Sequence, residues 1–399
     1  MVFVEPVYNL GGITPTSNAM IDKLQTAEVS SRFNFVPNYG ISALRDVITT
    51  TGGGTVSNSG ENFLLQSSAT ANSLAQLTTT ERGQFLSVAF DCGMNVQVPA
   101  VPVGTQKVEW GYTDGVNGVY FGQDSVGVYV ALLQNGVETQ KVYQQNWNVD
   151  TMDGTSQSRV TLNTFTGYLY QIRYGYSYGQ VELRIVAVNP QNFQQPITIH
   201  RFNPLGDILI SDPNQNIKAL ANNGAAGGSI SLNVGGRYFN NLGTVTETSR
   251  ITTEMRTNTL VTNTVFSPTV SFRRKQFFPD ATTRPNSVNL SIESFDILAS
   301  VDFAWELRIN AQLTGASFGT IASTPSSETA LLSDVTATAM NQTAGVRILA
   351  GISLAGKTEG LSNFNVNYAL PGNEILTLAV KSLSGIGNGS VALRMRELW

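Results

Sequence analysis

The chain has very little of the side-chain chemistry that most enzymes and metal sites use. Its 399 residues include a single cysteine, Cys92, and a single histidine, His200. One cysteine excludes an intrachain disulfide, and no group of histidines and cysteines has the spacing of a zinc site. No motif supports Cys92 and His200 as a nucleophile and its base, so we expect a buried cysteine and a hydrogen-bonded strand histidine.

Charge is also scarce, and long apolar runs are absent. Charged residues make up 13% of the chain and the net charge is −4, whereas globular proteins average roughly 25% charged residues. This composition lacks the basic footprint of a nucleic-acid-binding protein. No run approaches the roughly 20 apolar residues of a membrane span, and residues 1–6 have no basic segment, so we expect neither membrane insertion nor a signal peptide.

What the sequence does contain is a long series of strand and turn signals. The segment 109–202 carries Asp114-Gly115 and Asn117-Gly118 between apolar residues, and such dipeptides supply the positive φ angles of tight hairpin turns. Residues 301–309 alternate apolar and polar side chains with a period of two. Many short strands with glycine-containing turns predict an all-β fold, with two antiparallel β-sandwiches of jelly-roll type.

Composition shifts predict the domain organisation. Residues 1–60 read as an extended N-terminal arm, with a short helix at 17–27, followed by a Gly/Ser/Thr linker. The arm either docks on another molecule or folds back on its own domain. A first sandwich is predicted over 61–244 and a second over 245–399.

A row of aromatic residues is the main candidate for a contact surface. In the run 168–178 the tyrosines and one isoleucine occupy a single parity, which places them on one face of a strand. Such a face either packs against a second sheet, which is the commoner arrangement, or stacks on sugars or a neighbouring subunit. The candidate glycan or subunit contact residues are Trp147, Tyr170, Tyr174, Tyr176 and Tyr178.

Catalytic, metal and cofactor sites are not predicted. Acidic residues fall mostly in turns, where they serve the backbone, and we find no strand-borne pair of the Glu-x-Asp or Glu-x-Glu kind that would indicate a glycoside hydrolase. Asn148, Asp150 and Asp153 could offer oxygens to calcium, but their spacing does not match an EF-hand. The glycine-rich runs 52–60 and 222–236 lack the Lys-Ser/Thr ending of a phosphate loop. We therefore expect a non-enzyme without cofactor or metal.

Several motifs together resemble a family of viral proteins. They are Trp110-Gly-Tyr, Asp114-Gly-Val-Asn117-Gly, Tyr143-Gln-Gln-Asn-Trp147-Asn-Val-Asp150, Asp153-Gly154, His200-Arg-Phe202, the segment from Asn62 to Thr70, and the closing Arg396-Glu-Leu-Trp399. Over most of residues 61–399 the chain resembles uncharacterised β-rich virion structural proteins of tailed bacteriophages and large double-stranded DNA viruses. The resemblance implies a component of the tail, collar, fibre or capsid surface, located in the virion, and carries no catalytic residues.

Two functions remain open on the sequence. The first is a virion structural protein that assembles through its N-terminal arm and its sandwich surfaces, with copies of itself and other virion proteins as partners. The alternative is a glycan-binding adhesin that contacts host-surface sugars. A polysaccharide-cleaving enzyme is the third hypothesis, and the shortage of catalytic groups argues against it.

Overall fold

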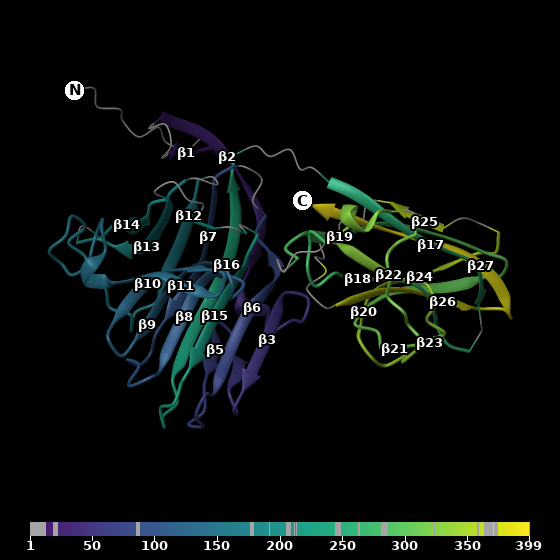
Figure 1. Cartoon of the computed structure of the whole chain (residues 1–399), viewed down its shortest axis with the longest axis horizontal. Helices are drawn as coiled ribbons and strands as arrows, with labels where there is room; N and C mark the ends of the chain where they lie inside the picture. Colours follow the sequence, from purple (N-terminus) through teal and green to yellow (C-terminus); the bar gives the residue numbers. More distant parts are fainter. Residues whose placement is uncertain are drawn as a thin grey trace. The chain divides into compact units, whose positions relative to one another are not determined.

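The computed structural model is built almost entirely of antiparallel β-strands (Figure 1). It describes residues 13–18, 23–84, 88–175, 179–190, 192–204, 209–210, 212, 214–243, 249–261, 264–280, 286–322, 324–356, 359–362, 370 and 374–398. The chain divides into two compact units, Met1–Thr246 and Glu247–Trp399. The predicted all-β fold with antiparallel sheets is confirmed.

The first unit contains a seven-stranded sheet in the order β11-β10-β9-β8-β15-β6-β3. Its strands are β3 (Asp46–Thr51), β6 (Leu74–Arg82), β8 (Lys107–Thr113), β9 (Gly118–Asp124), β10 (Val128–Gln134), β11 (Val137–Tyr143) and β15 (Asn216–Asn222). Asp114 accepts hydrogen bonds from the backbone N–H groups of Val116 and Asn117, both at 2.8 Å. These bonds close the turn between β8 and β9, where the sequence predicts a hairpin.

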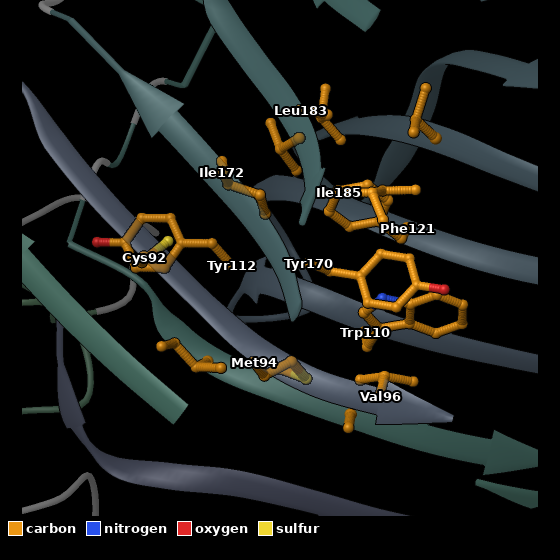
Figure 2. Packing of buried hydrophobic residues seen from close by; sticks show 14 of the residues in the cluster. Cys92, Met94, Val96, Trp110, Tyr112, Phe121, Tyr170, Ile172, Leu183 and Ile185 are labelled. Atoms are coloured by element: carbon orange, nitrogen blue, oxygen red, sulfur yellow. The ribbon is translucent and has the colours of Figure 1, made fainter. Parts of the chain in front are cut away.

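The second sheet of this unit follows the order β1-β2-β16-β7-β12-β13-β14, with β4 and β5 attached beside β16. Its strands are β1 (Ile13–Asn18), β2 (Lys23–Phe35), β4 (Thr55–Asn58), β5 (Phe63–Gln66), β7 (Phe90–Gln97), β12 (Tyr168–Tyr174), β13 (Val181–Val188), β14 (Gln194–Phe202) and β16 (Ser231–Leu242). Alternate residues of both sheets meet in one hydrophobic core. Figure 2 shows Trp110, Phe121 and Tyr170 packed together in it. The centroids of the Trp110 and Tyr170 rings are 4.9 Å apart, and the rings meet edge to face.

The second unit has its own core and sheets. A four-stranded sheet runs β17-β27-β19-β25, a five-stranded sheet runs β22-β18-β26-β20-β24, and β21 pairs with β23. Their bounds are β17 (Ser249–Val261), β18 (Ser267–Arg274), β19 (Asn289–Ala299), β20 (Phe303–Ile309), β21 (Leu313–Thr314), β22 (Leu331–Asp334), β23 (Ala339–Met340), β24 (Val346–Ser353), β25 (Glu359–Ser362), β26 (Ile375–Ser382) and β27 (Gly387–Leu398). Phe295 and Trp305 lie at the centre of this core, with ring centroids 4.6 Å apart.

The N-terminal 60 residues differ from the prediction. The expected helix at 17–27 is wrong, because β1 and β2 form an antiparallel pair there and β2 continues along β16. The expected Gly/Ser/Thr linker is also wrong, because it forms β3 and β4. Threonines have a high strand propensity, and Gly52 and Gly53 adopt positive φ angles at the turn between these strands. Residues 1–12 of the predicted arm lie outside the described residues.

Candidate functional site

Three of the five residues predicted as an aromatic contact surface are not at the surface. Trp147, Tyr170 and Tyr174 are buried in the core of the first unit, with Tyr174 fully enclosed. Tyr176 and Tyr178 lie outside the described residues. The shared parity predicted from the sequence holds for Tyr170 and Tyr174, but this face of β12 packs against the opposite sheet. The contact-surface prediction is therefore corrected to core for these three residues.

The side-chain oxygens considered as calcium ligands already accept hydrogen bonds from neighbouring protein groups. Asp150 accepts hydrogen bonds from the backbone N–H groups of Met152 and Ser158, both at 2.8 Å. Asp153 accepts from the N–H and hydroxyl of Thr155. Asn148 makes two bonds to the Arg201 backbone. Within the described ranges, no three His, Cys, Asp or Glu side chains gather as a metal site would require.

Cys92 and His200 occupy the same sheet but not the same site. The register runs from Cys92 to Ile172, then to Leu183, then to His200. Three strand spacings separate their backbones by about 14 Å. Burial raises the pKa of the Cys92 thiol and lowers the pKa of His200 to about 4. Cys92 and His200 are therefore too far apart to act together as a nucleophile and its base.

A pocket of mixed polar and apolar lining lies instead on the outer face of the seven-stranded sheet. Its volume is about 260 Å³. It is lined by Lys107, Glu109, Trp110, Gly111, Thr113, Gly115, Tyr120, Leu133, Gly136, Glu138, Lys218 and Leu220. Because Trp110, Phe121 and Ile217 point into the core, strand alternation turns Glu109, Tyr120 and Lys218 outward.

Glycine at the centre of a cross-strand row creates the hollow. The register places Lys218 and Tyr120 on either side of Gly111, on β15, β9 and β8 respectively. A Cβ at Gly111 would lie 2.5 Å from the Val119 carbonyl oxygen, so the position needs glycine. With no side chain between them, the Lys218 and Tyr120 side chains form opposite walls of the pocket.

Glu109 is a hydrogen-bond acceptor in the pocket. One of its oxygens, Oε1, accepts hydrogen bonds from the Lys107 ammonium at 2.7 Å and the Tyr129 hydroxyl at 2.9 Å. Among the described residues its other oxygen, Oε2, makes no hydrogen bond. The Glu109 side chain is only 12% exposed. Its orientation is thus fixed while one oxygen remains available to a ligand.

Lys218 is the corresponding donor. Its side chain is half-buried, and its ammonium has no hydrogen-bond partner among the residues that the structure describes. It lies against the β8–β9 turn, where a Cβ at Gly115 would be 3.1 Å from Nζ. Burial lowers the pKa of Lys218, and the nearby Glu109 and Asp114 carboxylates partly oppose this. An acceptor in the pocket would therefore satisfy a partly desolvated cation.

Aromatic packing stiffens the neighbouring wall. The Tyr120 and Tyr129 rings meet edge to face at 6.4 Å, and Tyr129 meets Tyr143 in the same way at 5.7 Å. The Lys141 ammonium lies 3.8 Å from the centre of the Tyr129 ring and pairs with Asp124 at 2.8 Å. Burial, together with the Glu109 and Glu138 carboxylates, raises the pKa of Tyr120. The Tyr120 hydroxyl therefore stays protonated at neutral pH.

Comparisons with known proteins identify similar folds but no family. No family model matches the chain, and neither does any curated protein. Among solved structures, a peanut lectin bound to a nine-residue peptide is similar over 55% of this chain and 100% of its own length, at 14% identity and a TM-score of 0.36. A legume lectin-like domain from Entamoeba histolytica is similar over 50% of this chain and 91% of its own length, at 11% identity and a TM-score of 0.31.

A protein of unknown function from Shewanella oneidensis is similar at the same level. The match covers 60% of this chain and 99% of that protein, at 11% identity and a TM-score of 0.37. All three TM-scores are below 0.5. The described helices are three-residue 3-10 turns, and none has the length or apolarity to cross a bilayer.

Proposed function

We propose that the first unit is a glycan-binding module and that the pocket beside Gly111 takes one neutral saccharide unit. The observation that carries the proposal is the pairing of an unpartnered donor with an available acceptor. Lys218 and Glu109 line the same hollow, and the Lys218 ammonium and Glu109 Oε2 make no hydrogen bond among the described residues. A sugar hydroxyl both donates and accepts, so adjacent hydroxyls can satisfy both groups.

The charge balance of the pocket favours a neutral ligand. Lys107 and Lys218 contribute two positive charges, and Glu109 and Glu138 contribute two negative charges. Leu133, Leu220 and Tyr120 supply apolar surface for the carbon face of a ring. Small-molecule pockets are typically about 300–1,000 Å³, and 260 Å³ suits a ligand below drug size.

Binding without catalysis is part of this proposal. Glu109 is already held by two donors, Lys107 and Tyr129. A glycoside hydrolase needs a second carboxyl that stays protonated as the general acid. Incubation with oligosaccharides and an assay for new reducing ends distinguishes the two functions, and we expect no release.

Saturation-transfer NMR against a panel of neutral and acidic oligosaccharides tests the binding itself. In Lys218→Met the stem is kept and the ammonium is lost, and a hydrogen bond to a charged group contributes about 1.5–3 kcal/mol. We expect affinity to fall roughly ten- to a hundredfold with an unchanged melting temperature. Lys381→Met, at another half-buried strand lysine on β26, is the matched control. An oligosaccharide affinity that is unchanged in Lys218→Met, or no binding by the natural chain, would refute the proposal.

We also propose that this module acts on a virus particle, as the sequence resemblance implies. The support is compositional, since a surface with few charges suits close packing against neighbouring virion proteins. Mass spectrometry of purified particles tests the location. Absence of the chain from particles whose other structural proteins are detected would contradict it.

A further inference from the structure

Strand β24 is an exposed edge of the five-stranded sheet in the second unit. Among the described residues it pairs with β20 alone. An edge strand presents unpaired backbone N–H and C=O groups to solvent, which are ready to pair with another strand. Proteins usually protect such edges with charges, proline or a short length.

Most other sheet edges in this chain carry one of these protections. Strands β1 and β14 contain Pro15 and Pro196, and β11 carries Glu138 and Lys141. Charged residues are frequent in β17, and β22 and β25 have only four residues each. Strand β3 is the exception, but it has six residues and Ile48 is only 37% exposed.

In contrast, the part of β24 that follows Arg347 offers an uncharged and apolar edge. The sequence Ile348–Gly356 has no charged residue. The Arg347 side chain pairs with Glu306, with Nε to Oε2 at 2.6 Å, and Glu306 also pairs with Arg308. Ile352 is 72% exposed and Leu354 is 57% exposed. This edge therefore combines free backbone groups with solvent-facing apolar side chains.

Gly351 is the middle residue of the regular part of the edge. A shift of register opposite Leu307 interrupts the pairing at Ile348, so the regular edge runs from Leu349 to Ser353. Antiparallel pairing of this segment with itself, centred on Gly351, places Ile352 beside the Ala350 of a second copy. Both residues are exposed in this structure, and neither contributes a charge that would oppose the contact.

We propose that β24 pairs antiparallel with β24 of a second copy of this chain, forming a two-fold dimer through a continuous sheet. Identical strands in this arrangement make an isologous contact, which closes after two subunits. The self-matched apolar edge favours a second copy over a charged partner strand. The inference depends only on the second unit and is independent of the pocket.

Sedimentation velocity of the full chain across a concentration series tests this dimer. We expect the mass to rise from 42.9 kDa toward twice that value. Ile352→Lys places two lysines near each other across the two-fold axis and should weaken dimerisation at least tenfold. Ala350→Lys, on the same edge, should act in the same way.

Ile386→Lys is the control, because Ile386 is 70% exposed in the same unit but lies outside β24. It should leave the dimer intact, and all three variants should keep the circular dichroism spectrum of the natural chain, which shows that each still folds. A natural chain that stays monomeric at the highest concentration overturns the proposal. So does an oligomer that survives Ile352→Lys, or one larger than a dimer.

Discussion

Asp46 and Arg237 form an ion pair that joins the two sheets of the first unit. The Arg237 Nη2 to Asp46 Oδ1 distance is 2.7 Å, and the side chains of Arg237 and Asp46 are 2% and 0% exposed respectively. Asp46 begins β3, and Arg237 lies on β16. The guanidinium also lies 5.1 Å from the centre of the Phe63 ring. The pair is enclosed, so each charge depends on the other for compensation.

Asp46→Asn should be strongly destabilising. It would leave the Arg237 charge buried without a counter-ion, and breaking one side of a buried pair typically costs about 3–5 kcal/mol. Urea unfolding followed by tryptophan fluorescence measures the change in the free energy of unfolding.

The double variant Asp46→Leu/Arg237→Met is the informative comparison. Removing both charges removes the desolvation cost as well, so its stability should lie closer to that of the natural chain than Asp46→Asn does. A double variant that is less stable than Asp46→Asn would show that the pair stabilises the fold beyond compensating its own burial.

Tyr174→Ala should destabilise the first unit by about 3–5 kcal/mol, the usual cost of removing a buried aromatic ring. Its ring packs 5.6 Å from that of Phe90. Phe193→Ala is the matched control, because Phe193 is 69% exposed and its loss should change stability by less than about 0.5 kcal/mol. Similar midpoints for the two variants in thermal unfolding would contradict the core assignment of Tyr174.

The aromatic residues of β12 show how much of the structure could be predicted from the sequence. Period-two alternation correctly places Tyr170 and Tyr174 on one face of β12, because strand geometry fixes that spacing. Alternation does not say whether the face meets a second sheet or solvent. That depends on Trp110 and Phe121, which come from β8 and β9, and therefore on packing between distant segments.

The pocket depends even more on non-local pairing. Glu109 and Lys218 are far apart in sequence and meet only because β8 pairs with β15. A local signal exists at Gly111, since a glycine inside a strand often marks a close approach or a bend. The partners of Gly111 follow from register, which no local pattern determines.

The pH dependence of His200 can be measured by NMR without ambiguity of assignment, because His200 is the only histidine in the chain. Burial lowers its pKa from 6.5 to about 4, and its Nδ1 accepts a hydrogen bond from the Asn148 N–H at 3.2 Å. The ring should therefore remain neutral, with its proton on Nε2, down to about pH 5. Its contribution to stability should be lost as the pH falls from 6.5 to 4. A two-dimensional NMR titration of the imidazole nitrogens measures this, and a midpoint near 6.5 would contradict the buried placement.

Glu81, at the end of β6, should give the opposite pH dependence. Burial raises its pKa from 4.5 to about 7, and Arg32 only partly offsets this. Between these values the folded chain binds more protons than the unfolded chain, so the free energy of unfolding falls as the pH rises through this window. The shift corresponds to about 3 kcal/mol.

Glu81→Gln isolates this contribution, because glutamine stays neutral at every pH. The stability of the variant relative to the natural chain should increase by about 3 kcal/mol between pH 4.5 and 8 and stay constant outside that range. Asp91, whose pKa burial raises to about 6, is present in both proteins and cancels in the difference. Urea unfolding at closely spaced pH values measures this, and parallel stability curves would show that Glu81 ionises freely in the folded chain.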